Sequence, residues 1–275
     1  HSKDYSILAD KMRPGHADYA GHVRYQGFND YRGGGHFSGR LTAPLVFAGA
    51  VAKQALAQYG IVVGSHILQI NDIKEERFNP MGVSDKVLAE LHAKKFAVMD
   101  DAVGEKMQER ILQAKSELNS VGGVIEAVAL RLPAGIGAPY FDSVESMLSH
   151  ALFSVPAVKG VEFGDGFGFA RLTGAEANDA LHYVDGKVQA LTNHNGGVTG
   201  GITNGMPLVV RVAIKPTPSI AREQQTVSLK EQADTTLAIV GRHDPCIVQR
   251  AVPVIEAVVA WTLWDLLLEA KKWEK

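Results

Sequence analysis

The sequence predicts an α+β fold, because its strand-like and helix-like segments are grouped instead of alternating steadily along the chain. Two long apolar segments, 42–59 and 252–271, frame the rest and show no clean polar face. Helices of that kind are expected to be buried, here under sheets. No low-complexity stretch or linker divides the 275 residues, so we expect a single domain over 1–275.

Proline and glycine mark the ends of the two long helices. The first is expected over 42–59, with Pro44 in its opening turn and Gly60 as its stop signal. The second is expected over 252–271, where Pro253 stands near the start. A proline is tolerated there because the first turn of a helix leaves its N–H groups unbonded in any case.

Two shorter helices and several strands complete the expected elements. Apolar residues recur at helical spacing over 104–118, and Asp142 with Glu145 can form a capping box for a helix that follows. The strands are expected where β-branched residues are frequent and glycines often mark the ends. These runs are 66–70, 124–132, 161–163, 167–172, 187–191, 208–214 and 226–229.

Composition argues against several classes of protein. A formal net charge of -2 supplies no general cationic field for nucleic acid or for a polybasic membrane contact. The single cysteine, Cys246, excludes an intrachain disulfide and a thiolate-rich zinc site, which favours a cytoplasmic protein. The apolar stretch 251–268 contains Glu256 and Asp265, so a core helix is expected there and not a membrane span.

Cationic side chains gather between Arg13 and Arg40. This segment holds four arginines and three histidines against two aspartates, and it includes the triplet 33–35, which consists of glycine alone. Guanidinium groups beside backbone that can approach a ligand closely suit a phosphate or a carboxylate. The alternative is a solvated loop whose arginines pair with nearby acids.

Three later segments could contribute to such a site. The run 193–201 has paired glycines beside Asn and Thr, which can hold phosphate or a planar cofactor, or can simply be tight turns. Two prolines in 215–220 present Lys215 in a rigid geometry. Residues 242–244 combine a cation, an imidazole and a carboxylate, which could move protons or form a loop salt bridge.

Other chemistries find less support. Loops 35–40 and 241–245 echo each other, since both carry basic side chains ahead of an apolar helix, where an anion is favoured. A structural repeat and a chance similarity remain equal alternatives. A metal site could be formed in principle by His16, Asp18 and His243, but no pair of these residues has helical ligand spacing, so no metal is predicted. A Gly-x-Ser-x-Gly elbow is missing from the sequence, which argues against a serine hydrolase.

Taken together, these motifs resemble the chorismate synthase family. The matching strings are 2–5, 13–19, 30–35, 196–207, 215–220 and 241–246. They occur in the order of the family and extend over nearly the whole chain. The resemblance implies a carbon–oxygen lyase of the shikimate pathway. Its reaction would be the reduced-FMN-dependent anti 1,4-elimination of phosphate from 5-enolpyruvylshikimate-3-phosphate, which gives chorismate.

The resemblance also implies roles for individual residues. His16 would protonate or stabilise the anionic reduced flavin, and Asp244 would help to relay a proton to flavin N5. The residues implied to contact substrate are Arg13, Ser38, Arg40 and Arg242. The residues implied to hold the flavin and its phosphate are Asn193, Gly196, Gly197, Gly200, Gly201, Lys215, Thr217 and Ser219.

The same resemblance implies a β-α-β sandwich, with long helices buried between antiparallel sheets, and a homotetramer. It associates the chain with NADP, although no separate reductase domain is visible. One alternative is a truncated, catalytically weak fragment that binds FMN or phosphate, because the family's N-terminal segment with a Ser-His-Gly motif does not precede His1. Another is a flavin oxidoreductase, which would show net oxidation of flavin.

The loop 36–40 departs from the family pattern. His36, Phe37 and Gly39 replace the first, second and fourth residues of the Arg-Ser-Ser-Ala-Arg that many members carry. An imidazole is cationic only when protonated, whereas a guanidinium always is, so phosphate affinity should depend more strongly on pH here.

We expect His36→Arg to flatten the pH dependence of the substrate KM, because the replaced group then keeps its charge between about pH 6 and 8. Steady-state kinetics across that range measure the effect. An unchanged profile would count against a role for His36 in binding phosphate.

Overall fold

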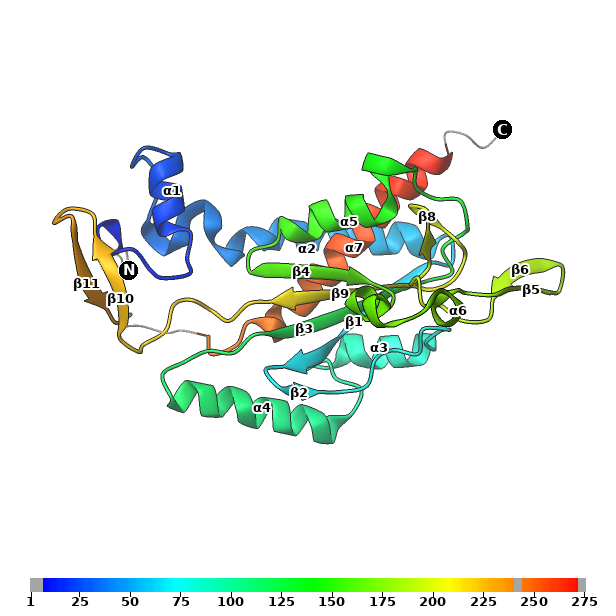
Figure 1. Cartoon of the computed structure of the whole chain (residues 1–275), viewed down its shortest axis with the longest axis horizontal. Coiled ribbons are helices and arrows are strands. Elements are labelled where there is room, and N and C mark those ends of the chain that lie inside the picture. Colours follow the sequence, from blue (N-terminus) through cyan, green and yellow to red (C-terminus); the bar gives the residue numbers. More distant parts are fainter. Residues whose placement is uncertain (1–6, 240–243, 272–275) are drawn as a thin grey trace.

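A five-stranded antiparallel sheet forms the centre of the protein, in a computed structural model that describes residues 7–239 and 244–271. The strand order is β2-β1-β3-β9-β4, and Figure 1 shows the sheet running through the middle of the molecule. The strands are β1 (Val62–Ile70), β2 (Ile73–Lys74), β3 (Gly123–Leu130), β4 (Val158–Phe163) and β9 (Leu208–Ile214). This sheet and the helices that pack on it confirm the predicted α+β class.

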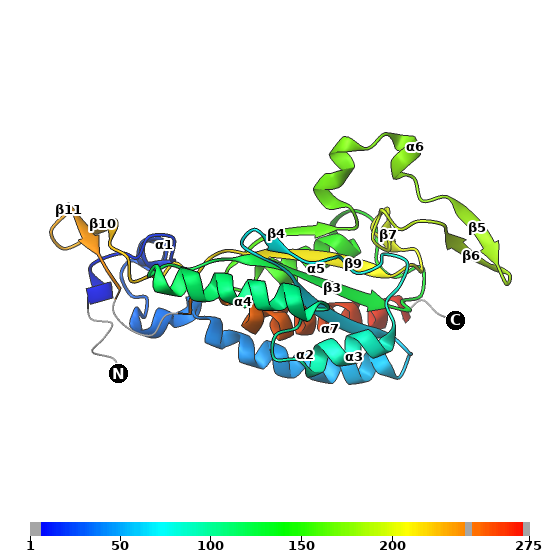
Figure 2. The same ribbon diagram turned by 90° about the horizontal axis from the view of Figure 1, so that it is seen from below.

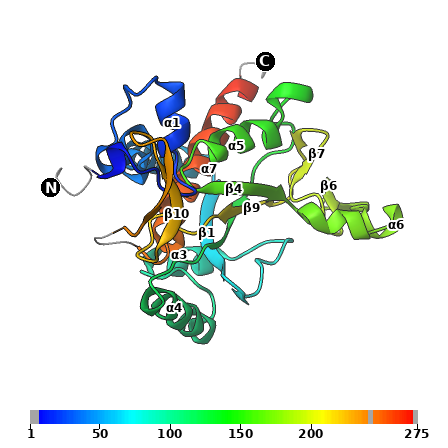
Figure 3. The same cartoon turned by 60° about the vertical axis from the view of Figure 1, so that its left-hand side comes forward.

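Three helices lie over one face of the sheet. α7 (Val248–Lys271) packs on β1 and β3, and α5 (Val144–Phe153) packs on β4. α2 (Ala43–Ala57) lies against α7, and Figure 3 shows α5 and α7 on the same side of the sheet. Gly49 permits the close approach of α2 to α7, because a Cβ at this position would collide with Ala257.

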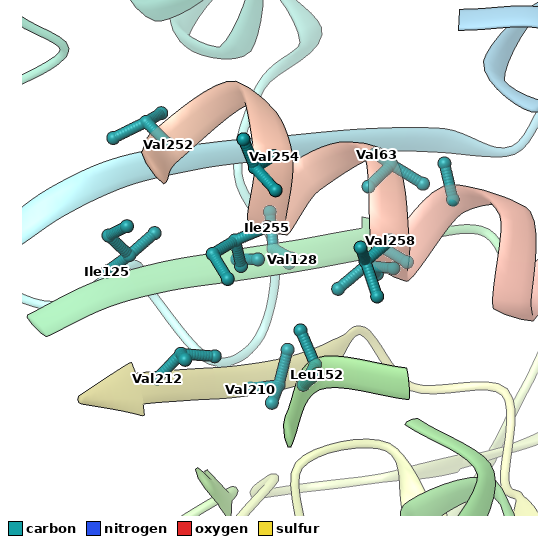
Figure 4. Packing of buried hydrophobic residues seen from close by; sticks show 14 of the residues in the cluster. Val63, Ile125, Val128, Leu152, Val210, Val212, Val252, Val254, Ile255 and Val258 are labelled. Atoms are coloured by element: carbon teal, nitrogen blue, oxygen red, sulfur yellow. The ribbon is translucent and has the colours of Figure 1, made fainter. Parts of the chain in front are cut away.

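β-Branched side chains fill the space between α7 and the sheet (Figure 4). The strands contribute Ile125, Val210 and Val212 to this space, and the helix contributes Ile255 and Val258. All five side chains are fully buried. By length and composition α7 could cross a membrane, but 72% of its most apolar window is buried inside the protein. The prediction of a core helix is therefore confirmed.

The prediction that both long helices are buried is wrong for the outer face of α2. Phe47 and Val51 are 76% and 55% exposed, and the buried positions are confined to Gly49, Ala52 and Leu56. Among residues 7–239 and 244–271, the five-stranded sheet covers only one face of the helix layer. The apolar sequence of α2 is therefore only half explained by contacts within the described chain.

Two predicted helix starts are corrected by the side chains that cap them. α4 (Asp101–Ser116) begins three residues before the predicted 104, because the Asp100 carboxylate accepts hydrogen bonds from the first backbone N–H groups. α5 is capped by Ser143 and not by Asp142, since the Ser143 hydroxyl accepts the N–H of Ser146 at 3.0 Å.

The predicted strand 167–172 is wrong. Gly164 and Gly166 have φ of 54° and 53°, so the chain turns at the end of β4 and forms a 3-10 segment, Gly166–Arg171. The chain then continues through α6 (Gly174–Ala177) and the hairpin β5 (Leu181–Val184) and β6 (Lys187–Ala190). Figure 2 shows this arm projecting from the body of the protein.

The remaining elements lie at the edge and at the ends of the sheet. α3 (Asp85–Ala93), which was not predicted, packs on β1, and α4 lies along β1 and β2. One end of the molecule carries α1 (Asp18–Arg24) with the hairpin β10 (Gln224–Ser228) and β11 (Ala233–Leu237). The other end carries the hairpin β7 (Val198–Thr199) and β8 (Ile202–Thr203) and the arm (Figure 1).

A row of charges of alternating sign crosses the sheet, buried at His66, Glu126 and Arg211 and partly exposed at Glu162. His66 on β1 lies opposite Glu126 on β3, which lies opposite Arg211 on β9, which lies opposite Glu162 on β4. Glu126 is 3.1 Å from His66 Nε2 and 3.2 Å from Arg211 Nη1, and Arg211 Nε is 2.6 Å from Glu162. Glu75 extends the row through a hydrogen bond with His66 Nδ1.

The ionised form of each central member is stabilised by its neighbours. Burial alone lowers the pKa of His66, but its hydrogen bonds with Glu126 and Glu75 outweigh burial and raise that pKa. Burial alone raises the pKa of Glu126, but His66 and the N–H of Phe78 outweigh it and lower that pKa. Both directions favour an ion pair of His66 with Glu126 over a pair of neutral groups.

We expect Arg211→Met to lower the free energy of unfolding by about 3–5 kcal/mol, because buried Glu126 would lose one of its two cationic partners. Arg131→Met is the control, since Arg131 pairs with Asp85 in solvent and should cost less than about 1 kcal/mol. Urea unfolding of both variants measures the difference. Equal losses would show that the buried row adds nothing to stability.

Candidate functional site

The N-terminal segment meets the segment after β9 at one end of the sheet. Lys215 Nζ donates a hydrogen bond to the Gly15 carbonyl, and Arg13 Nη1 donates to the Ser219 hydroxyl at 3.3 Å. Figure 1 shows α1 beside the chain that leaves β9 at this end. Two of the segments that the sequence associated with an anion site are thus brought together.

Asp18 anchors the cationic residues of this region. Its carboxylate is 2.7 Å from both Nε and Nη2 of Arg13 and 2.6 Å from Nδ1 of His16. Burial alone raises the pKa of Asp18, but the hydrogen bonds from Arg13 and His16 outweigh burial and hold the pKa far below its usual range. Asp18 is therefore ionised, and the Arg13 guanidinium is largely occupied by it.

The glycine triplet 33–35 forms a strained loop that only glycine tolerates. Its three residues have φ of 62°, 87° and 49°, a region that side chains with a Cβ rarely adopt. At Gly35 a Cβ would also collide with the carbonyl oxygen of Asp30. The triplet therefore keeps its backbone close to its neighbours without any side chain between them.

This loop faces His16 and Arg40. A Cβ at Gly34 would lie 3.7 Å from His16 Nε2 and 3.7 Å from the Ser38 Cβ, and one at Gly33 would lie 3.0 Å from Arg40 Nη1. The Ser38 hydroxyl accepts the N–H of Arg40 at 3.3 Å, which fixes the turn between them. Ser38, Arg40 and His16 thus surround one glycine loop.

The cations of this region differ in their availability. Arg32 pairs with Asp30 at 2.8 Å in solvent, and its hydrogen bonds lower the pKa of Asp30 to about 2. The solvated-loop alternative is therefore right for Arg32. In contrast, the Arg40 guanidinium makes no ion pair or hydrogen bond with residues 7–239 or 244–271. The Thr217 hydroxyl is buried and also lacks a hydrogen-bond partner within those ranges.

Asp244 reaches the same end of the sheet through the backbone. The Pro245 carbonyl accepts the N–H of Val121, two residues before the β3 end that pairs with the end of β9. The Asp244 carboxylate is 2.8 Å from Nη1 of Arg250 on α7. Arg242, predicted to contact substrate, lies outside the described residues.

The glycine run after Asn193 lies at the opposite end of β9. The Gly196 carbonyl accepts the N–H of Val209, near the start of that strand, whereas Lys215 follows its last residue. The seven residues of β9 span about 20 Å. Within one chain, the two predicted parts of the flavin site are therefore not brought together.

Most polar groups of this glycine run are engaged in holding its own fold. The Asn193 amide donates to the carbonyls of Pro80 and Pro207 and accepts the N–H of Gly197 at 2.7 Å. Gly200 differs, because a Cβ there would meet no atom within 4 Å, although its φ is 63°. Among the four glycines predicted to hold the flavin, Gly200 is therefore the one with space beside it for a bound group.

Comparison with known proteins identifies the family. A model of the family described as chorismate synthase matches residues 1–268. The chain belongs to the chorismate synthase family. Chorismate synthases of Pyrococcus abyssi and Thermococcus gammatolerans are 46% and 47% identical to it over 273 residues, which are 99% of this chain and 75% of each relative. A crystal structure of chorismate synthase covers 92% of this chain and 70% of that protein, with 31% identity and a TM-score of 0.75.

Membership of the chorismate synthase family confirms the predicted function and the predicted carbon–oxygen lyase activity. The relatives match nearly the whole chain, which favours the enzyme over a fragment that only binds FMN or phosphate. The roles of individual residues remain predictions. Sequence reasoning considered Asp18 only as a possible metal ligand and gave it no role in the reaction, although it stands two residues after His16 at the start of α1.

We expect Gly34→Ala to weaken binding of inorganic phosphate at least tenfold, because the added methyl group lies beside His16 Nε2 and Ser38 and strains the loop. Gly60→Ala is the matched control: its φ of 73° is similarly positive, but its surroundings are open. Both variants should lose about 1–2 kcal/mol of stability, because a Cβ is placed in the left-handed region. Calorimetric titration with phosphate separates them, and equal affinities would place the anion elsewhere.

Proposed function

We propose that this chorismate synthase family member binds 5-enolpyruvylshikimate-3-phosphate and reduced FMN at the end of the sheet that carries His16, Arg40 and Lys215. There it would eliminate phosphate from one ring carbon and a proton from another, with anti 1,4 geometry. The observation that carries the proposal is that the Arg40 guanidinium, which has no partner among the described residues, and the half-buried His16 imidazole face one glycine loop, while Lys215 binds the Gly15 carbonyl next to His16. Such a cluster suits an anionic substrate beside an anionic cofactor.

The residues present fit a phosphorylated cofactor. The buried Thr217 hydroxyl lacks a partner within the described chain and could donate to a phosphate oxygen, next to Lys215 and Ser219. When bound, the reduced flavin supplies transient electron density that helps phosphate to leave the substrate. The chain's own part is then to neutralise charge, to exclude water and to place protons.

Each polar side chain of the site has a separate task in this proposal. Arg40 and Lys215 stabilise phosphate charge, and the glycine loop lets that charge approach the backbone. His16 holds or delivers a proton at Nε2, the ring nitrogen that faces Gly34. Asp244, held by Arg250, assists proton transfer toward the flavin.

A second copy of the chain accounts for the distant glycine run. Gly200 cannot reach the site of its own chain across β9, but its open surroundings allow it to face a flavin held by a neighbouring copy. This agrees with the predicted homotetramer, in which each site combines parts of two chains. A cytoplasmic location belongs to the same proposal, and the association with NADP concerns only the reduction of the flavin.

Two variants test the reaction and the shared site together. Arg40→Ala and Gly200→Asp should each lower anaerobic turnover about a hundredfold, because one removes a donor to developing charge and the other adds a repelling carboxylate. Turnover is followed as phosphate and chorismate release with dithionite-reduced FMN. Equimolar mixing of the unfolded variants and refolding should restore about a quarter of the wild-type rate, the fraction of sites that take both intact parts.

Arg24→Ala is the control for Arg40→Ala, since Arg24 is an exposed arginine of the same segment and should leave turnover within about twofold. Failure of the mixture to recover any activity would place each site within one chain. Binding of FMN by the wild-type protein without turnover would instead favour the fragment that only binds flavin. Net oxidation of the flavin with each substrate turned over would favour an oxidoreductase.

A further inference from the structure

Asp18 contacts His16 and Arg13 at the same time. It is 8% exposed, and its Oδ1 lies 2.6 Å from His16 Nδ1 and 2.7 Å from Arg13 Nη2. Its Oδ2 accepts the backbone N–H and the Nε–H of Arg13 at 3.1 and 2.7 Å. Both oxygens of the Asp18 carboxylate are therefore engaged by His16 and Arg13.

These distances decide which ring nitrogen of His16 carries hydrogen. A carboxylate has only lone pairs, so an unprotonated Nδ1 at 2.6 Å would place two acceptors against each other. Arg13 Nη2 lies farther from Nδ1, at 3.1 Å, and already donates to Asp18. The shorter contact prevails, and Nδ1 donates to Asp18. The other ring nitrogen, Nε2, then faces Gly34 and has no hydrogen-bond partner among residues 7–239 and 244–271.

We propose that Asp18 is a positioning residue that keeps hydrogen on Nδ1 of His16, so that Nε2 alone exchanges protons with the site. The inference rests on the proposed function, in which His16 acts toward the flavin. A carboxylate that holds an imidazole through one nitrogen fixes both its tautomer and its ring orientation. Arg13 completes the arrangement, because its two bonds keep the carboxylate from turning away from His16.

Asp18→Asn should reverse the tautomer of His16. An asparagine presents one oxygen and one NH2 group, and the Arg13 guanidinium, which only donates, takes the oxygen. The NH2 group then faces Nδ1, which must accept, so that hydrogen moves to Nε2. The same change in a serine protease triad leaves the geometry intact and lowers kcat about 10⁴-fold through the wrong tautomer.

The test is nitrogen-15 NMR of histidine in the flavin-free protein, with the His16 signals assigned by comparison with His16→Gln. The wild type should show the Nδ1–H tautomer whenever the ring is neutral, and Asp18→Asn should show Nε2–H. Asp30→Asn is the matched control, because Asp30 is an exposed aspartate of the same segment that pairs with Arg32. It should leave His16 unchanged.

Anaerobic turnover supplies the second measurement. Asp18→Asn should lower kcat by about 10² or more, with a change in KM below about tenfold, because a proton donor is lost and a binding group is not. A wild-type His16 with Nε2–H overturns the inference without any variant, even if Asp18→Asn fails to fold. The Nδ1–H tautomer in a wild type that has no turnover would support the positioning role and contradict only the proposed function.

Discussion

Glu126 stands between His66 and Arg211 on the three central strands, and its carboxylate binds both of them away from water. Unpaired charges in such a place cost several kcal/mol each, so the sheet is stable only in the register that joins them. If the pairing of two strands slipped by one residue, the charged side chains of one strand would lie on the other face of the sheet. A slip by two residues would place these charges opposite valines. The alternating row thus selects one pairing of β1, β3, β9 and β4.

That register also determines which loops meet at each end of the sheet. Gly123 pairs with Ile214, so the segments before β3 and after β9 leave the sheet together. Lys215 and Ser219 then receive the N-terminal segment through Gly15 and Arg13, about two hundred residues away in sequence. The candidate site is therefore built from distant segments whose meeting depends on strand pairing and not on local sequence.

The sequence predicted well where local chemistry decides the structure. Pro44 and the apolar run behind it gave α2 to within two residues at each end, because a helix start is a local event. The predicted strand 167–172 failed because its aromatic character was outweighed by glycines at positive φ, which turn the chain after β4. α7 begins four residues before its predicted start at 252, so Pro253 stands inside the helix and not in its first turn.

The candidate site was predictable in composition but not in geometry. Arginine, histidine and glycine in one short segment indicated an anion site, and resemblance supplied the roles. Which arginines are available could not be predicted from the sequence, because Asp18 pairs with Arg13 and Asp30 pairs with Arg32, which leaves Arg24 and Arg40 without partners among the described residues. The separation of Gly200 from Lys215 was equally hidden, since both flank the same strand in sequence.

The exposed outer face of α2 has a consequence for how the protein behaves in a tube. Phe47 and Val51 stand one helical turn apart and expose apolar surface to water. Attraction between such surfaces strengthens on warming, because burial of apolar groups is driven by entropy near room temperature. A chain with this face uncovered will therefore adhere to other molecules and to vessel walls more readily in a warm solution than in a chilled one.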